Sequence, residues 1–325
     1  HLVGNIGLPA LDILSEVQPE DIVVYELSSF QLWDMEKSPS IAVITNIEPD
    51  HLDVHDDFDD YVQAKMNIFA HQTADDFAIY NGQNKEILSR INQLKTETPA
   101  KFIAFPSSEC AHISGDQFAW NGQELFNLNI LKLPGAHNQL NALAAINATF
   151  PILNAKFDNL EDIKRAWTEG LAKFEGLPHR LKFVAEKGGV KFYDDSIATT
   201  PGSAIAAINA FSAPKILILG GSDKGADLSE LVEKIAKSSA SEVKNVVLIG
   251  GEADNLQNKL AEVGFRRFIN LGKGAVMPEI VETAYDLAVA GDIVILSPAH
   301  ASFDMFKSYS DRGDRFVRAV KGIGR

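Results

Sequence analysis

Short apolar runs followed by polar residues recur along the chain. Two of them, residues 22–27 and residues 40–46, are rich in β-branched residues, which is typical of buried strands in a parallel sheet covered on both faces. Glu26 ends the first run, and His51 lies in the polar stretch after the second. Open α/β sheets bind ligands beyond the carboxyl ends of their strands, so we expect Glu26 and His51 to approach one crevice.

The residue types around these two positions narrow the chemistry. A single strand-end glutamate or loop histidine is more often structural, but carboxylate and imidazole together suit a divalent cation that bridges phosphates. Zinc is disfavoured, because His51 and His55 lie in an Asp-rich loop without cysteine rather than on the helix that a zinc-protease motif requires. A helix expected over residues 61–69 places Lys65 among apolar residues.

The next segment changes from polar turns to a helix. Residues 114–133 are turn-rich and predict short antiparallel strands. Helical periodicity follows over residues 139–149 after a Pro-Gly turn, with Asn138 near the helix N-terminus and Asn141 one turn further on. Asn138 is a good N-cap residue. Alternatively, two amides on one face match the donor and acceptor edge of a nucleotide base.

A break in composition at residues 173–180, where Gly176 and Pro178 interrupt the chain, predicts two domains, residues 1–176 and residues 177–325. The second begins with a hairpin pattern over residues 181–193. Strands and helices then alternate, which predicts a doubly wound, Rossmann-like sheet. The expected strands are residues 216–219, 246–249 and 293–296, and the expected helices are residues 228–236, 256–263 and 277–290.

Three strand exits in this second domain are polar and rich in small residues. They contain Asp195, the Gly220-Gly221 pair with Lys224, and Ser302. Taken singly, Lys224 is a solvated lysine and Asp195 a helix cap. Three such exits on one sheet edge favour a ligand site. The dinucleotide motif G-x-G-x-x-G is absent, so NAD binding is disfavoured.

Composition limits the partners and the compartment. The formal charge of −14, without a basic run, argues against a nucleic-acid interface. Cys110 is the single cysteine, so an intrachain disulfide is impossible and a reducing compartment is natural. No apolar run approaches the ~20 residues that span a bilayer. We therefore expect a cytoplasmic protein that binds neither nucleic acid nor membrane.

Taken in order, the motifs resemble the Mur ligases along essentially the whole chain. The resemblance implies an α/β fold, with a central ATPase domain (a mostly parallel sheet with helices on both faces) that is incomplete here, followed by a Rossmann-like C-terminal domain, in a monomer. The matching segments begin at Gly4, Glu26, Asn46, Asp50, Ala64, Gly135, Gly176, Asp195, Gly220, Ser297 and Arg312.

Within the family, the match favours an enzyme that joins D-glutamate to UDP-N-acetylmuramoyl-L-alanine through an acyl phosphate, with ATP and Mg²⁺. The resemblance implies that Lys65, in carbamylated form, and His51 are catalytic and hold Mg²⁺ with Glu26. The other implied contacts are Asn138, Asn141, Arg180 and Asp195 for ATP, Asn5 and Ser28 for the muramoyl precursor, and Thr199, Lys224, Ser302 and Tyr309 for glutamate.

Two departures from the family pattern keep alternatives open. The phosphate loop G-x-x-x-x-G-K-[ST] is not found, and it would precede residue 1. We therefore expect the chain to be a fragment with little activity by itself. Ile197 stands where the family has lysine, which leaves open a ligase for another amino acid or stereoisomer, or a folylpolyglutamate synthetase. A catalytically silent ligand-binding module is the remaining alternative.

Overall fold

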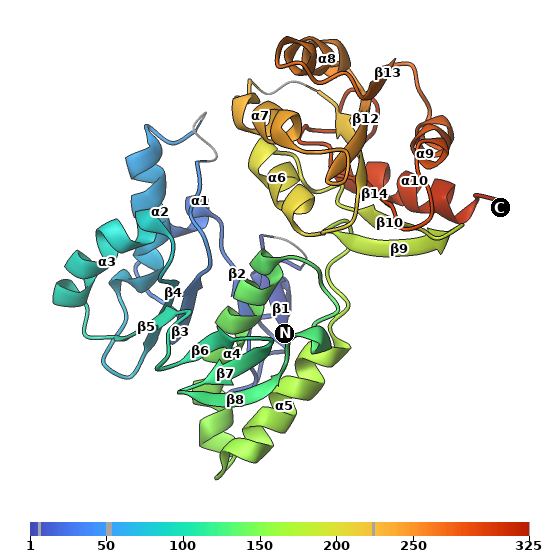
Figure 1. The fold of residues 1–325 in the computed structure, drawn as a ribbon. Coiled ribbons are helices and arrows are strands. Elements are labelled where there is room, and N and C mark those ends of the chain that lie inside the picture. The colour runs from blue at the N-terminus through green and yellow to red at the C-terminus, as the bar shows by residue number, and fades with distance from the viewer. Residues whose placement is uncertain (6–7, 50–53, 223–224, 325) are drawn as a thin grey trace. The chain divides into compact units, whose positions relative to one another are not determined.

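The computed structural model describes residues 1–5, 8–49, 54–222 and 225–324 (Figure 1). The chain divides into two compact units. The first unit comprises His1–Ile130 and Gln139–Leu171, and the second comprises Leu131–Asn138 and Ala172–Arg325. The domain boundary that the sequence predicts after residue 176 stays a prediction.

In the described part of the first unit, the strands form three small sheets (Figure 1). A parallel pair is followed by a three-stranded parallel sheet and a three-stranded antiparallel sheet. The antiparallel strands predicted for residues 114–133 are confirmed, although they begin a few residues earlier. The strands are β1 (Leu2–Gly4), β2 (Val24–Glu26), β3 (Ile41–Ile44), β4 (Phe77–Asn81), β5 (Lys101–Phe105), β6 (Ala111–Ser114), β7 (Gln117–Trp120) and β8 (Gln123–Asn127).

Helix α2 shows how the helices of this unit form. Its N-cap Asp57 accepts a hydrogen bond from the Asp60 N–H, so the helix begins before the predicted residue 61. Its apolar face, which includes Met66 and Phe69, packs into one core with β3 and β4. The helices are η1 (Ala10–Ile13), α1 (Ser29–Leu32), α2 (Phe58–Ala70), α3 (Lys85–Glu97), η2 (Leu128–Ile130), α4 (Ala136–Lys156) and α5 (Leu160–Lys173).

Strand β2 corrects the prediction of two buried strands. All three of its residues are exposed, with Val24 at 59% and Tyr25 at 45%. Among the described residues β2 is hydrogen-bonded to β1 alone, whereas β3 pairs with β4 and alternates between half-buried and buried positions. An apolar run is buried only where another layer covers it, and the run alone does not reveal that layer.

The second unit is built on one six-stranded sheet in the order β13-β12-β11-β14-β10-β9. The predicted hairpin is confirmed, because β9 runs antiparallel to β10. The other neighbours are parallel, as predicted for a Rossmann-like sheet. The strands are β9 (Lys182–Lys187), β10 (Val190–Asp194), β11 (Lys215–Gly220), β12 (Val243–Ile249), β13 (Phe268–Gly272) and β14 (Ile293–Leu296).

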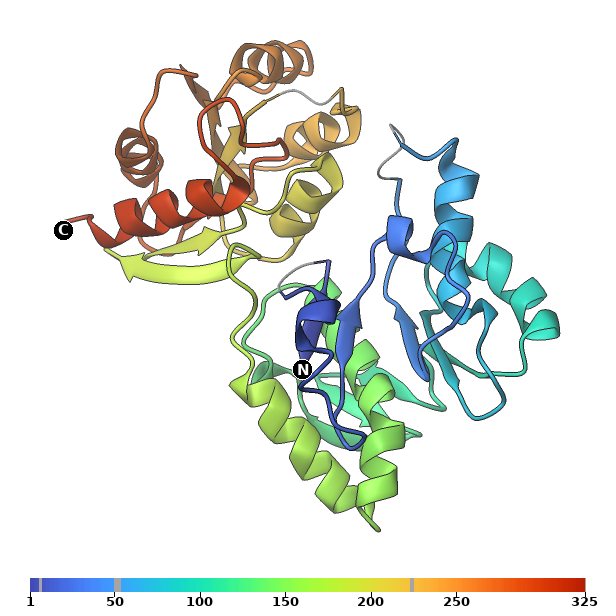
Figure 2. The same cartoon turned by 180° about the vertical axis from the view of Figure 1, so that it is seen from behind.

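Helices cover both faces of this sheet. Along β11, Leu217 and Leu219 enter one core, and Ile216 and Ile218 enter the other, as the two-residue period of a strand requires. The first core is closed by α6 (Pro201–Asn209), α7 (Ser229–Lys237) and α8 (Ala253–Glu262), the second by α9 (Met277–Asp286) and α10 (Tyr309–Lys321). Figure 2 shows α10 lying along the sheet beside β9 and β10.

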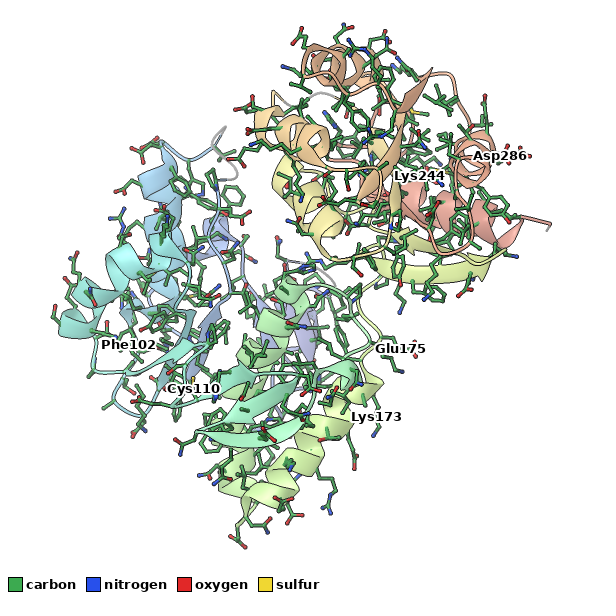
Figure 3. All side chains as sticks on the ribbon, in the orientation of Figure 1. Phe102, Cys110, Lys173, Glu175, Lys244 and Asp286 are labelled. Carbon is green, nitrogen blue, oxygen red and sulfur yellow. The ribbon has the colours of Figure 1, made fainter. Side chains whose placement is uncertain are left out.

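Two features of the described residues concern membrane-spanning helices and the single cysteine. No helix of the described residues is long and apolar enough to cross a membrane. Cys110, labelled in Figure 3, is buried, and its thiol donates a hydrogen bond to the Ala104 carbonyl over 3.0 Å. Burial raises the pKa of this thiol above its ordinary value, so Cys110 is a core residue without nucleophilic character.

Candidate active site

Two predicted site residues, Asn5 and Glu26, lie side by side at the exits of β1 and β2. The Asn5 N–H donates a hydrogen bond to the Glu26 carbonyl over 2.9 Å. In the parallel register Gly4 stands opposite Glu26. Gly4 has φ +127°, and a Cβ there would overlap the Glu26 carbonyl, so only glycine permits this close approach. The backbone thereby fixes both residues, and the Glu26 residue itself is exposed.

Ser28, two residues further on, begins α1. Its hydroxyl accepts a hydrogen bond from the Gln31 N–H, and the Gln31 side chain accepts one from the Ser28 N–H over 2.9 Å. This reciprocal capping box holds the chain in a fixed turn directly after β2. Ser28 thus follows Glu26 by two residues and stands in a turn fixed by its own hydrogen bonds.

A buried histidine ties this exit to the helix that carries Lys65. His55 is only 3% exposed, and its Nδ1 lies 2.8 Å from the Asp60 carboxylate. A carboxylate accepts hydrogen bonds, so Nδ1 donates to Asp60, and Nε2 lies 3.0 Å from the Ser29 hydroxyl. The ring also stacks on Trp33 at 4.5 Å between centroids. His55 is therefore structural, and it locks α1 onto α2.

The structure describes two of the three residues that the resemblance assigns to Mg²⁺, Glu26 and Lys65. Lys65 is half-buried, with its Nζ 4.8 Å from the centre of the Tyr61 ring. His51 lies outside the described residues. Among the residues that are described, no three His, Cys, Asp or Glu side chains gather into a metal-binding group. Mg²⁺ keeps most of its waters and needs only one or two protein carboxylates, such as Glu26.

The exit of β3 is anchored by amide side chains. Asn84, the N-cap of α3, donates a hydrogen bond to the Ile47 carbonyl over 3.0 Å. Asn46 donates to the Glu48 carboxylate over 2.7 Å. These contacts hold the polar stretch after β3 as far as residue 49, and residues 50–53 lie outside the described part.

In the second unit, Asn138 lies in the first turn of α4, which begins at Ala136, so it is not the N-cap that the sequence suggests. Its side-chain amide donates to the Pro134 carbonyl over 2.7 Å, and the residue is 7% exposed. Asn141, one turn further on, is exposed. The two amides therefore lie on the same helix, but Asn138 is buried and Asn141 is exposed.

The Asp195 carboxyl is strongly perturbed by its surroundings. Burial, aided by the charge of its neighbour Asp194, raises the pKa of Asp195 to about 7. Hydrogen bonds from the Ser297 hydroxyl (2.8 Å) and the Leu181 N–H (3.0 Å) act in the opposite direction. The Arg180 cation also lowers the pKa of Asp195.

Arg180 links Asp195 to the start of α4. Burial lowers the pKa of His137, and the charge of Arg180 lowers it further. Arg180 is thus within electrostatic range of both Asp195 and His137, the residue before Asn138. The structure brings three predicted nucleotide contacts, Asn138, Arg180 and Asp195, to one region of the second unit.

Backbone hydrogen bonds join the exits of β10, β11 and β14. The Ala299 N–H donates to the Ala198 carbonyl, and the Ser222 N–H donates to the Ala301 carbonyl, both over 2.9 Å. Gly221 has φ +149°, and a Cβ there would overlap the Ala301 carbonyl. Because Thr199 follows Ala198 and Ser302 follows Ala301, these bonds hold two predicted amino-acid contacts in one network.

Two further residues, Tyr309 and Lys224, are predicted to contact the amino acid. The Ser196 hydroxyl donates to the Tyr309 carbonyl over 2.8 Å, which joins the start of α10 to the β10 exit. Lys224 lies outside the described residues. The predicted glutamate contacts are therefore partly assembled within this unit, with Thr199, Ser302 and Tyr309 on three segments that contact one another.

Several residues that hold these exits carry no assigned role in the sequence-based hypothesis. His179 Nδ1 lies 2.8 Å from the Asp194 carboxylate, and Ser297 bonds Asp195. Arg312 is fully buried in α10. Phe316 and Val320 follow Arg312 by one and two helical turns, so all three lie on the buried face of α10. The sequence contains this spacing, but an arginine is not expected on a buried face.

Comparison with known proteins identifies the family. The sequence model described as Mur ligase middle domain matches residues 4–149, and that described as Mur ligase, glutamate ligase domain, matches residues 179–300. A UDP-N-acetylmuramoylalanine–D-glutamate ligase of Acetivibrio thermocellus is 39% identical, over 99% of this chain and 68% of its own length. One of Clostridium kluyveri is 36% identical, over 98% and 68%.

Solved structures with low identity share the fold. MurF ligase from Thermotoga maritima in complex with ADP has a TM-score of 0.64 at 16% identity, covering 96% of this chain and 70% of that one. Mycobacterium tuberculosis folylpolyglutamate synthase, complexed with ADP and AMPPCP, has a TM-score of 0.64 at 18% identity, covering 97% and 70%. These likenesses confirm the predicted α/β fold class.

Proposed function

The chain belongs to the Mur ligase family, and from this we propose that it joins D-glutamate to UDP-N-acetylmuramoyl-L-alanine, with ATP, in the synthesis of peptidoglycan. One observation carries the proposal: relatives bearing that activity in their names are 35–39% identical over nearly the whole chain. Both family models, the middle domain and the glutamate ligase domain, match this chain.

The reaction has two steps. A carboxylate is a poor electrophile, so the alanyl carboxylate of the precursor first takes the γ-phosphoryl group of ATP, which breaks the bond to ADP and forms an acyl phosphate. The amino group of glutamate then attacks the acyl carbon, an amide bond forms, and phosphate leaves with the bonding electrons. The ammonium form of glutamate gives up its protons to solvent or base. The protein supplies positions and charges rather than a nucleophile.

In the first unit we assign Glu26, His51 and Lys65 to Mg²⁺. When bound, Mg²⁺ would offset the negative charge of the phosphate groups during phosphoryl transfer. Carbamylation of Lys65 would replace its positive charge with a carboxylate. Mg²⁺ would then have a second anionic ligand besides Glu26. Asn5 and Ser28, fixed by the backbone beside Glu26, are assigned to the muramoyl precursor.

We assign one group of side chains to each remaining substrate. Asn138, Asn141, Arg180 and Asp195 bind the nucleotide, supported by the electrostatic proximity of Arg180 to Asp195 and to the start of α4. Thr199, Lys224, Ser302 and Tyr309 bind glutamate, whose carboxylates need donors and a cation. Lys224 is the cation of this set, because Ile197 offers none.

The identity of the amino acid is the finest part of this proposal. Ile197 lacks the cation expected beside Thr199, so a ligase for another amino acid or stereoisomer is the second candidate. The names of the relatives favour D-glutamate.

We further propose that the protein acts in the cytoplasm as a monomer.

Phosphate release tests the proposal. The protein expressed from its complete gene is incubated with UDP-N-acetylmuramoyl-L-alanine, ATP and Mg²⁺, and with D-glutamate, L-glutamate or other amino acids in parallel. We expect release with D-glutamate alone. We also expect Glu26→Gln to abolish it, whereas Glu20→Gln, at another exposed position of the first unit, leaves it unchanged. Release with a different amino acid would reassign the substrate, and no release would support a silent binding module.

A further inference from the structure

Arg312 is the largest fully buried side chain among the described residues. It lies in α10, and burial lowers its pKa to about 10 while the charges of Asp304 and Asp194 oppose this shift, so it stays charged at neutral pH. None of its hydrogen bonds within the described part of the chain goes to a carboxylate. A buried cation is costly to keep, which calls for a reason.

The guanidinium joins two strand exits. Its Nε donates to the Ser196 hydroxyl over 2.9 Å and its Nη2 to the Ser196 carbonyl over 2.8 Å. On the other side, Nη1 and Nη2 donate to the His300 carbonyl over 3.0 and 3.1 Å. One planar group therefore spans the exit of β10 and the exit of β14.

The same contacts reach the start of α10. The Ser196 hydroxyl accepts from Arg312 and donates to the Tyr309 carbonyl over 2.8 Å. This short chain of hydrogen bonds connects three segments of the second unit. Thr199 follows Ser196 by three residues, Ser302 follows His300 by two, and Tyr309 is the first residue of α10.

We propose that Arg312 is a positioning residue that holds Thr199, Ser302 and Tyr309 in register for the amino-acid substrate. The inference rests on the proposed function, since these three side chains are the ones assigned to glutamate. Arg312 acts only through Ser196 and His300, and it does not touch the substrate. The three residues lie on three separate segments of the chain, so a shift of one segment alone would misplace its contact.

Lysine is a poor substitute for this arginine. Its single nitrogen carries three donors around one point, whereas the guanidinium presents donors on three nitrogens in a fixed plane. Arg312→Lys keeps the charge and most of the volume but loses the simultaneous contact with Ser196 and His300. The variant thus separates geometry from charge.

The second buried cation of this unit provides a matched control. Lys215 is also 0% exposed, and its Nζ donates to the Ala213 and Glu242 carbonyls over 3.0 and 3.3 Å. It lies at the first residue of β11, the end of the strand opposite to the Gly220 exit. Lys215→Met therefore removes a buried cation bonded to carbonyls without touching the candidate pocket.

The experiment compares both variants with the parent in protein expressed from the complete gene, with the amino acid or the precursor varied in turn and the other substrates saturating. We expect Arg312→Lys to raise the KM for the amino acid at least tenfold, with the KM for the muramoyl precursor changed less than twofold. Lys215→Met should lower the melting temperature and leave both KM values unchanged. Ser196→Ala removes the hydroxyl that accepts from Arg312 Nε and donates to the Tyr309 carbonyl, but it leaves the Ser196 and His300 carbonyls bonded to the guanidinium, so it should raise the amino-acid KM by a smaller factor.

Three results would overturn the inference. They are unchanged amino-acid kinetics in a folded Arg312→Lys protein, an equal rise of both KM values, or an amino-acid KM in Lys215→Met that rises as much as in Arg312→Lys. If Arg312→Lys does not fold, Ser196→Ala decides, and unchanged kinetics there refute the proposal. Failure of the proposed function is recognised separately, because it shows in the parent protein, which would then release no phosphate with D-glutamate.

Discussion

Replacing Asp195 with asparagine should flatten the pH dependence of stability of the second unit. The Asp195 carboxyl is 6% exposed, and burial raises its pKa to about 7 from an ordinary value of 3.8. Asparagine has the same shape as the protonated carboxyl. Its oxygen can accept from the Leu181 N–H, and its amide can donate to the Ser297 hydroxyl, which is free to rotate.

The sign and size follow from proton linkage. Between pH 3.8 and about 7 the folded state holds a proton that the unfolded state has released, so stability falls as the pH rises through this window and is constant above it. Each pH unit is worth about 1.4 kcal/mol. From pH 5 to pH 8, the parent should therefore lose about 3 kcal/mol of unfolding free energy relative to Asp195→Asn. Other groups titrate alike in both proteins and cancel in the difference.

The assay must observe the second unit. Trp33, Trp120 and Trp167 are the three tryptophans of the chain, and all lie in the first unit. Urea unfolding is therefore followed by far-ultraviolet circular dichroism, which responds to both units, at pH 5, 6, 7 and 8. Tryptophan fluorescence serves as the internal control, and its transition should be the same in the parent and the variant at every pH.

A difference in unfolding free energy that stays constant from pH 5 to pH 8 would refute the reasoning. It would mean that the Asp195 carboxyl is ionised in the folded protein throughout this range, and that Ser297 and Leu181 outweigh burial. A depressed pKa would give the same constant difference, because above pH 5 the carboxyl would then be ionised in both the folded and the unfolded state. A constant difference is distinguishable from the predicted fall of about 3 kcal/mol.

Three further changes test the first unit. Gly4→Ala forces a Cβ into the Glu26 carbonyl at φ +127°, and we expect it to cost about 1–3 kcal/mol in urea unfolding and to reduce activity. Gly170→Ala meets nothing within 4 Å in helix α5 and should stabilise by about 1 kcal/mol, measured in the same way. His55→Ala removes the bonds to Ser29 and Asp60, and should cost about 3 kcal/mol and shift tryptophan fluorescence; an unshifted spectrum would contradict the Trp33 stack.

Much of the second unit is predictable from sequence because its strands are short apolar runs between helical patterns. Ile293–Leu296 is confirmed residue for residue. Phe268–Gly272 is not predicted from sequence, because it is an edge strand with the polar Asn270 in its middle. The Asn270 side chain donates hydrogen bonds to Asp254 and Gln257 of the adjacent helix. Edge strands are half-exposed, so their composition approaches that of a loop.

The candidate site can be predicted from the sequence only in part. Strand exits are marked in the sequence by polar and small residues, so Glu26 and Asp195 can be proposed as candidates from sequence alone. The residues that hold the exits cannot, because arginine and histidine are ordinarily surface residues. The burial of Arg312 and His55 depends on which carbonyl, hydroxyl or carboxylate faces them across the fold. That information is tertiary, and no periodicity within one element contains it.

One structural device recurs at the exits of both units. At Gly4 and at Gly221, the backbone of one segment passes so close to a carbonyl of another, of Glu26 and of Ala301, that a side chain is excluded. In each case the next residue donates its N–H to that same carbonyl, Asn5 in the first unit and Ser222 in the second. The exit is thus positioned by backbone contact, which varies less than side-chain rotamers do. A site that must hold several anions at fixed distances gains from such rigidity, since the geometry is set before any ligand arrives.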